Sequence, residues 1–251
     1  MTARNQTLHT LRAGGSECCV WLALGSAAIA ELAAAAGARS IVFDLQHGLW
    51  ERTALEAAVG LVRATATPIV RVAENSAFSI GAALDSGAHG VLVPMVGTPA
   101  EAAAAVAAAH FPPNGIRSGG GVRPLADFPG YRQFAATEIV VGIMIETVAA
   151  AEDAASILAV PGIDLVFIGS GDLGISLEAS GRKDLTLERL VDGISKAAAA
   201  RSVPCGIFTN TAIEARQRAA QGFRFTVAQS DVTLIRAGVA DALRGAAPAS
   251  P

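Results

Sequence analysis

The sequence predicts an α/β protein folded as a single (β/α)8 barrel (a TIM barrel), and three observations carry this prediction. The chain has 251 residues, close to the size of one such barrel. Hydrophobic residues make up 52% of it, and alanine, a strong helix former, is abundant. Short apolar runs alternate eight times with segments of helical character. Eight strands, each followed by a helix, favour a closed barrel over an open sheet.

The expected strands are short runs of branched and aromatic residues. Runs that are apolar throughout are typical of parallel strands buried on both faces. Two examples are SIVFD at 40–44 and PIVRV at 68–72. We expect strands at 19–24, 40–44, 68–72, 90–94, 139–146, 164–168, 204–208 and 224–228.

Alanine-rich segments between these runs predict the helices, because alanine has the highest helix propensity. We expect helices at 27–36, 53–64, 78–86, 99–109, 148–158, 187–200 and 212–221, and a last helix at 232–243. No linker divides the chain, so we expect one domain over 1–251 in which the small, proline-containing tail at 245–251 frays.

One connection, from about 111 to 137, is longer than the others and has little hydrophobic periodicity. Long loops in compact domains are usually functional or disordered. The segment FPPNGIRSGGGVRP holds Arg117 and Arg123 among several glycines, which suits a loop that closes over an anion. A flexible excursion without function is the alternative.

Composition and charge narrow the class of partner. The net charge is −3 with no basic stripe, which argues against nucleic acid. No charge-free apolar run reaches about 18 residues, so no membrane span is expected. The first residues are polar and lack the hydrophobic region of a signal peptide. Three cysteines (Cys18, Cys19 and Cys205), an odd number without metal-site spacing, favour a reduced cytoplasmic protein.

Polar residues gather where the predicted strands end, which is where (β/α)8 barrels carry their active sites. The second strand ends in Asp44, the third contains Arg71 and the fifth ends in Glu146. The turns that follow these and other strands add Gln46, His47, Gly169, Ser170, Gly171, Asp172, Gln229, Ser230 and Asp231. One histidine, one arginine and several acids therefore converge on one barrel mouth.

Two of these acids, Glu146 and Asp172, come from adjacent strands. Two carboxylates, with waters and substrate, suit Mg²⁺ or Mn²⁺, which need few protein ligands. A zinc site is disfavoured because no cysteine pair or second histidine is near. The alternative is that each carboxylate caps a helix.

His47 and Arg71 are the other candidates for chemistry. Asp44 stands three residues before His47 and could orient its imidazole as a general base, although a lone histidine is often structural. Arg71 lies in an otherwise apolar strand and needs an anion, either a substrate or a structural ion-pair partner. His9 and His110 are interpreted as surface or loop residues, and His89, in the turn before a strand, as structural.

The segment GSGDLG at 169–174 fits G-x-G-x-x-G, but it is weak evidence for a dinucleotide site. It comes late in the chain, no clear helix follows at once, and no acid stands about 20 residues further on at a strand end. We interpret it as a nest of backbone N–H groups for a small carboxylate. A Schiff-base mechanism is disfavoured because the only lysines, Lys183 and Lys196, do not end strands.

The chain resembles the HpcH/HpaI aldolase family, the metal-dependent (class II) aldolases of 2-oxo acids. The segments that carry the resemblance run in family order from about Trp21 to Leu243: IVFDLQHGLWE, TPIVRVAENS, LDSGAHGVLVPMV, PPNGIRSGGGVRP, IMIETVAAAED, PGIDLVFIGSGDLGISL and CGIFTNTAIEARQRAAQGFRFTVAQSD. Glu146 within IET and Asp172 within IGSGDL are especially specific, as is LDSGAHGVLVP.

The resemblance implies the chemistry at the mouth. Glu146 and Asp172 would bind a divalent ion, Mg²⁺ or Mn²⁺, with Co²⁺ as a further candidate. His47 would be the acid/base, positioned by Asp44, and Arg71 would contact the keto or enolate oxygen.

It also implies the substrate contacts and the assembly. The amides of Gly171 and Asp172 would hold the substrate carboxylate, and Asp85 would reach a neighbouring subunit's site. Members are usually hexamers, trimers of dimers, in which the last helix is exchanged between partners. The remaining expected substrate-binding residues are Ser170, Gln46, Arg117 and Arg123.

The chain departs from the family pattern at three places, and the first two, Gln46 and Met144, affect substrate identity and rate more than metal binding. Relatives often have Glu where this chain has Gln46, and Gln where it has Met144. The arginine loop reads RSGGGVR where relatives often have a proline near the third glycine.

The implied function is reversible cleavage of 4-hydroxy-2-oxo acids to pyruvate, or hydroxypyruvate, and an aldehyde through a metal-stabilised enolate. Three alternatives stay open: a citrate-lyase-β-like enzyme acting on malyl- or citramalyl-type CoA thioesters, a dinucleotide-binding oxidoreductase, and a non-catalytic barrel that binds a 2-oxo acid.

Overall fold

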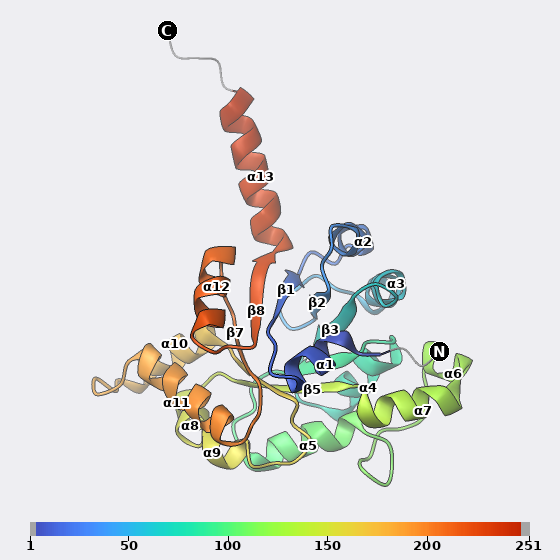
Figure 1. Ribbon diagram of the computed structural model, residues 1–251, viewed down its shortest axis with the longest axis horizontal. Helices are drawn as coiled ribbons and strands as arrows, with labels where there is room; N and C mark the ends of the chain where they lie inside the picture. The colour runs from blue at the N-terminus through green and yellow to red at the C-terminus, as the bar shows by residue number, and fades with distance from the viewer. Residues whose placement is uncertain (1–3, 247–251) are drawn as a thin grey trace.

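Eight parallel strands close into a barrel in the computed structural model, which describes residues 4–246 (Figure 1). Each strand pairs with the next along the chain and the last pairs with the first, so the expected (β/α)8 barrel is confirmed. All eight expected strands are present, with ends that differ by a few residues. They are β1 (Glu17–Leu22), β2 (Ser40–Asp44), β3 (Thr67–Arg71), β4 (Gly90–Val93), β5 (Val140–Ile145), β6 (Leu165–Ile168), β7 (Cys205–Ile207) and β8 (Phe225–Ser230).

The helices surround the barrel, and six of them begin at a Ser or Thr whose side chain accepts a hydrogen bond from a backbone N–H of the first turn. They include α2 (Ala27–Ala35), α3 (Arg52–Val62), α4 (Ala77–Asp85), α5 (Pro99–Ala109), α8 (Val148–Glu152), α9 (Ala154–Ile157), α11 (Leu187–Ala200) and α12 (Ala212–Ala220). The single helix expected over 148–158 is therefore divided in two.

The long connection is not the unstructured loop that its weak periodicity predicts. It contains α6 (Val122–Ala126) and α7 (Phe128–Thr137). Asp127 caps α7 by accepting a hydrogen bond from the Gly130 N–H, and Phe134 and Ala135 are buried. In Figure 1, α6 and α7 lie beside α4 on the outside of the barrel.

The barrel interior consists of inward-facing side chains, which alternate along each strand with side chains that face the helices. Trp21, Met144, Phe167 and Phe225 are among the largest in this inner cluster. Trp21 stacks on Phe167 with 5.7 Å between ring centroids. The interior of the barrel is therefore filled by side chains and holds no ligand site.

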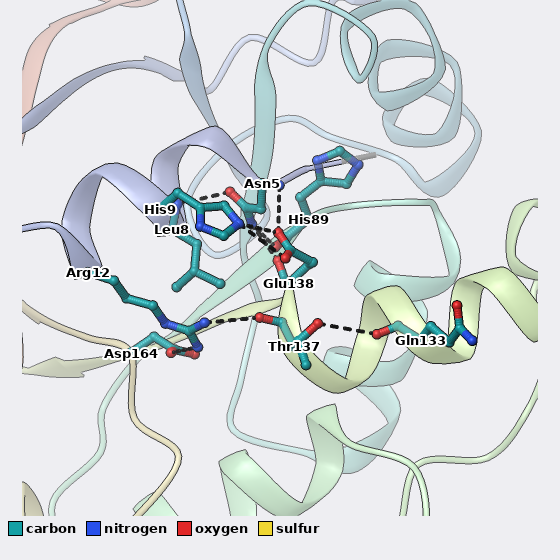
Figure 2. A network of polar contacts seen from close by, with 9 residues as sticks. All are labelled: Asn5, Leu8, His9, Arg12, His89, Gln133, Thr137, Glu138 and Asp164. Atoms are coloured by element: carbon teal, nitrogen blue, oxygen red, sulfur yellow. Dashed lines mark hydrogen bonds and ion pairs between the residues drawn. The ribbon is translucent and has the colours of Figure 1, made fainter. Parts of the chain in front are cut away.

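Helix α1 (Gln6–Arg12), which was not expected from the sequence, contacts this inner cluster through the buried side chains of Leu8 and Leu11. Asn5 caps α1, and its Nδ2 donates to the carbonyls of His89 and Glu138 at 2.9 and 2.7 Å (Figure 2). These carbonyls precede β4 and β5, so α1 is fastened across the amino ends of the strands.

The last helix, α13 (Asp231–Ala246), extends away from the barrel in Figure 1, and only Asp231 is buried. Of the tail expected to fray, residues 245 and 246 end this helix and residues 247–251 lie outside the described part of the chain. Over residues 4–246, none of the helices has the length and apolar character needed to cross a bilayer.

Candidate active site

A layer of charged side chains lies at the carboxyl ends of β2, β3 and β5. Asp44, Arg71 and Glu146 each stand two residues beyond an inward-facing apolar residue of the barrel cluster, Val42, Ile69 and Met144 respectively. Because side chains alternate along a strand, these three also face the barrel axis. All three are buried, with 3, 8 and 1% of their surface exposed.

Asp44 and Arg71 are direct partners in the pairing of β2 with β3 and form a two-point ion pair. Arg71 Nε donates to Asp44 Oδ1 at 2.8 Å and Nη2 donates to Oδ2 at 2.5 Å. Burial would raise the pKa of Asp44, but the hydrogen bonds and charge of Arg71 outweigh it, so the pKa lies below its usual value. Arg71 Nη1 makes no hydrogen bond within residues 4–246, so it remains available to an anionic ligand.

Trp21, which was not predicted as a site residue, also contacts this pair. Its Nε1 donates to Asp44 Oδ2 at 3.2 Å, and the Arg71 guanidinium lies 5.0 Å from the centre of its ring. The pair therefore has a hydrogen bond on one side and an aromatic face on the other. A tryptophan near the end of an otherwise apolar strand gives no sequence signal for such a role.

Asp44 also shapes the turn that carries His47. Its Oδ1 accepts hydrogen bonds from the backbone N–H groups of Gln46 and His47 at 3.0 and 3.2 Å. The contact with His47 is thus to the backbone, and across the described residues the imidazole has no hydrogen bond. His47 is exposed at the mouth, while Gln46 Oε1 is buried without a hydrogen-bond partner there.

The two carboxylate oxygens of Glu146 differ in their contacts. Its Oε2 accepts a hydrogen bond from the Met95 N–H at 2.8 Å, whereas Oε1 is buried and has no partner among the described residues. Gly169 makes this placement possible, because a Cβ at that position would collide with the Glu146 carboxylate. Burial and the nearby charge of Asp172 raise the pKa of Glu146, against the Met95 N–H and the charges of Arg71 and His47.

Asp172 and the glycine-rich segment form the first turn of α10 (Ser170–Ser180). The expectation that no helix follows GSGDLG at once was therefore wrong, because the helix begins at Ser170 itself. The N–H groups of Ser170, Gly171 and Asp172 stand in a first helical turn, where backbone donors lack helical partners and favour an anion. Asp172 is partly exposed and is the acidic residue of this turn.

Together, Glu146 and Asp172 suit a divalent cation with oxygen ligands. A buried carboxylate oxygen without a partner, beside a second carboxylate, lacks the positive charge that burial of acids requires. Within residues 4–246 no group of three or more His, Cys, Asp or Glu side chains is arranged for a metal. Two carboxylates alone favour an ion that keeps several non-protein ligands, as Mg²⁺ does.

The other expected site residues lie away from this mouth. Asp85 ends α4 and therefore lies near the amino end of β4; its Oδ1 accepts from Arg117 Nη2 at 2.8 Å. Arg117 also donates to Tyr131 Oη at 2.8 Å. Arg123 donates to the Glu56 carbonyl on α3. The structure thus brings together Asp44, Gln46, His47, Arg71, Glu146, Ser170, Gly171 and Asp172, and it places Asp85, Arg117 and Arg123 elsewhere.

The structure argues against a dinucleotide-binding oxidoreductase and against a Schiff-base mechanism. The closed barrel excludes the open, doubly wound sheet that the dinucleotide-binding alternative requires. Lys183 lies in an exposed turn after α10 and Lys196 is exposed on α11, so neither lysine points to a Schiff base at the mouth.

Comparison with known proteins identifies the family of the chain. A sequence profile of the HpcH/HpaI aldolase/citrate lyase family matches residues 17–237. A hydroxypyruvate/pyruvate aldolase of Sagittula stellata is 34% identical over 242 residues, 93% of this chain and 94% of its own. A 4-hydroxy-2-oxovalerate aldolase of Rhodococcus jostii is 33% identical over 237 residues, 92% of each chain.

Solved structures include a near match over almost the whole fold. An HpcH/HpaI aldolase/citrate lyase family protein from Burkholderia cenocepacia superposes with a TM-score of 0.89 at 29% identity, covering 96% of this chain and 98% of its own. The profile match spans most of the chain and includes every residue of the mouth. The chain therefore belongs to the HpcH/HpaI aldolase/citrate lyase family.

Proposed function

We propose that this chain is a divalent-metal-dependent aldolase that reversibly cleaves 4-hydroxy-2-oxo acids to an aldehyde and pyruvate or hydroxypyruvate. The observation that carries the proposal is Glu146, a buried carboxylate beside Asp172 and near Arg71 with one oxygen that has no partner within residues 4–246. The aldolase names of relatives at 31 to 35% identity support this reaction over thioester cleavage by a citrate-lyase-like enzyme.

Each residue of the mouth would have a separate role in such a reaction. The first-turn N–H groups of Gly171 and Asp172 would bind the substrate carboxylate, with Ser170 beside them. Arg71 would donate from its free Nη1 to the keto oxygen, because Asp44 already holds its other edge. His47, exposed at the mouth, would take the proton from the C4 hydroxyl when the C3–C4 bond breaks.

Glu146 and Asp172 would hold the metal ion, Mg²⁺ or Mn²⁺ with Co²⁺ as a further candidate. When bound, the ion would supply Lewis-acid stabilisation of the negative charge of the enolate. Gln46 stands beside His47 with a buried, unpartnered amide oxygen. This oxygen can accept a hydrogen bond, which would suit the hydroxyl of hydroxypyruvate. The three cysteines are free thiols, which supports a cytoplasmic location.

Proton exchange tests the enolisation without knowledge of the aldehyde. Chelator-treated protein is mixed with pyruvate in D₂O, and loss of the methyl signal is followed by NMR with and without Mg²⁺ or Mn²⁺. We expect metal-dependent exchange that Glu146→Gln and Asp172→Asn each slow by at least about a hundredfold, because even residues that only orient metal ligands matter about 10- to 100-fold.

Glu178→Gln is the matched control, since it removes an exposed carboxylate from the same helix as Asp172. It should leave the exchange rate unchanged. Exchange that needs no metal, or that persists in both carboxylate variants, would contradict the proposal. Exchange with hydroxypyruvate but none with pyruvate would identify hydroxypyruvate as the donor.

We further infer that the chain forms a hexamer, a trimer of dimers, in which α13 packs on a second copy. Ile235, Val239 and Leu243 are spaced by four residues and form an exposed apolar stripe along the helix, with 46, 54 and 68% of their surface exposed. A stripe of this kind is normally buried against another element. In such an assembly Asp85, which lies away from its own mouth, would reach a neighbouring subunit's site.

Light scattering after size exclusion tests this assembly. Ile235→Glu with Val239→Glu should shift the mass from that of a hexamer toward smaller species, because two charges would be buried. Arg236→Glu with Asp241→Lys, which changes charge on the same helix without touching the stripe, is the control. An unchanged mass in the stripe variant, or a monomeric wild type, would refute the exchange.

A further inference from the structure

A cavity, which we name the outer pocket, lies between α3, α4, α6 and α7 on the outside of the barrel. Its volume is about 490 Å³, within the range of small-molecule sites. Arg63 directly follows α3 and His89 directly precedes β4, so the pocket is near the amino ends of the strands. Its polar and aromatic lining consists of Arg63, His89, Arg123, Asp127, Tyr131 and Phe134.

The backbone makes room for Arg123 at this pocket. A Cβ at Gly60 would lie 2.5 Å from Arg123 Nη2, and a Cβ at Gly87 would lie 2.9 Å from Arg123 Cδ. The same position on Gly87 is 3.7 Å from Arg63 Nη1. Gly60 on α3 therefore leaves room for the guanidinium of Arg123, and Gly87, in the turn after α4, leaves room for its aliphatic stem beside the guanidinium of Arg63.

Positive charge at the pocket is incompletely balanced. Within the part of the chain that the structure describes, neither Arg63 nor Arg123 forms an ion pair, and Arg123 donates only to the Glu56 carbonyl. Asp127 is the one carboxylate of the lining, and its Oδ1 is engaged by the Gly130 N–H. The lining therefore holds two arginines and one carboxylate, and the excess positive charge suits an anionic ligand.

The remaining walls are aromatic. Phe134 stacks on Tyr131 with 6.2 Å between centroids at an interplanar angle of 28°, and it also packs on the His89 ring at 4.9 Å. Burial and the charge of Arg63 lower the pKa of His89 to about 4, so the ring is neutral near pH 7. The pocket thus offers charged donors at one side and flat apolar faces at the other.

We propose that the outer pocket binds a small organic carboxylate with a flat apolar body, the carboxylate between Arg63 and Arg123 and the body against Phe134 and Tyr131. Guanidinium groups match a carboxylate with paired N–H donors, and aromatic rings prefer offset or edge contacts with a flat body. The site is distinct from the mouth and does not depend on the proposed aldolase activity.

Calorimetric titration of the full chain with 3-phenylpropionate tests the pocket. We expect saturable binding of the acid and none of 3-phenylpropionamide, which has the same shape without the charge. A titration with inorganic phosphate separates the two kinds of anion: phosphate that binds here as tightly as the acid would overturn the role of the aromatic walls. Absence of binding by the acid would overturn the site itself.

Matched variants locate the binding. Arg63→Gln and Arg123→Gln should each weaken it by at least about tenfold, since a hydrogen bond to a charged group contributes about 1.5–3 kcal/mol. Arg132→Gln removes an exposed charge from α7 outside the lining and should change the Kd by less than about twofold.

Glu146→Gln distinguishes the pocket from the mouth, because it alters only the mouth. Binding that survives Glu146→Gln and fails in the two arginine variants supports the outer pocket. Binding that survives in the arginine variants, or that is lost with Glu146→Gln, refutes it. Thermal unfolding of each variant shows whether lost binding reflects lost structure; Arg63 is exposed, so its replacement should leave the fold intact.

Discussion

The mouth and the outer pocket use arginine in opposite ways. At the mouth, Arg71 is 8% exposed and its charge is matched by Asp44 through two hydrogen bonds. At the outer pocket, Arg63 is exposed, Arg123 is half-buried, and neither has a carboxylate partner within residues 4–246. Arg71 is thus held by an ion pair within the fold and keeps only Nη1 for a ligand. The charges of Arg63 and Arg123 are instead balanced by solvent or by a ligand.

The difference follows from what positions each side chain. Strand pairing sets Asp44 opposite Arg71, so the distance between them is fixed by the sheet. Arg63 ends a helix and Arg123 lies in α6, a short helix of the long connection, so no sheet register relates them. A rigid pair suits a catalytic centre that must be preorganised, while arginines at helix ends suit a site that a ligand completes.

The largest expected effect is at the buried pair. Asp44→Ala should lower the free energy of unfolding by about 3–5 kcal/mol, because it leaves Arg71 buried without its counter-charge. Urea denaturation of metal-free protein at neutral pH measures the loss. The turn that carries Gln46 and His47 would also lose its acceptor, so pyruvate exchange should fall with stability.

A double variant separates burial of charge from loss of contact. Replacing both partners, as in Asp44→Ala with Arg71→Met, should recover part of the stability lost in Asp44→Ala alone, since no unpaired charge remains. Equal stability of the single and double variants would mean that solvent reaches Arg71, so that its environment resembles that of Arg63.

A smaller effect is expected at the boundary of the outer pocket, from His89. Its pKa is about 4 in the folded protein against 6.5 as the ordinary value, because burial and the charge of Arg63 disfavour the charged form, against Glu138. Between these values the unfolded chain binds more protons. Stability that is fully present above pH 6.5 is therefore lost as the pH falls to about 4, by up to about 3 kcal/mol.

Comparison of the wild type with His89→Phe isolates this contribution from that of the acids. The variant keeps a ring against Phe134 and should show a shallower loss of stability between pH 6.5 and pH 4. The other charged groups around this position, Arg63, Glu138, Arg123 and Asp127, are present in both proteins. Parallel stability curves would mean that the pKa of His89 is the same in the folded and unfolded states.

The barrel and the charged layer at its mouth could be predicted from sequence because both depend on regular periods. Alternation along β2, β3 and β5 carries Asp44, Arg71 and Glu146 to one end of one axis. Gly169 and Trp21 were not recognised in their roles, since one makes room for Glu146 and the other contacts Asp44 only after the strands assemble. Such contacts join residues far apart in the chain.

Other features escaped prediction because local chemistry or tertiary packing decides them. Helix α7 depends on the Asp127 cap and on burial of Phe134 against neighbouring helices, so its sequence shows little periodicity alone. Helix α1 depends on the open amino end of the barrel, which receives Leu8 and Leu11. The outer pocket combines α3, the turn before β4, α6 and α7, and no sequence spacing relates these segments.

The smallest expected effect is that of Arg63→Gln, and it tests the difference between the two arginine sites directly, because the same Arg→Gln change can be made at the mouth and at the outer pocket. Arg63→Gln should change the free energy of unfolding by no more than about 0.5 kcal/mol, as is usual for exposed residues without a partner. Arg71→Gln should cost several-fold more, because it leaves the buried Asp44 carboxylate without its cation. Chemical denaturation of both variants under the same conditions provides the measurement. If Arg63→Gln were as damaging as Arg71→Gln, Arg63 would have a structural partner, and the positive charge of the outer pocket would belong to the fold and not to a ligand.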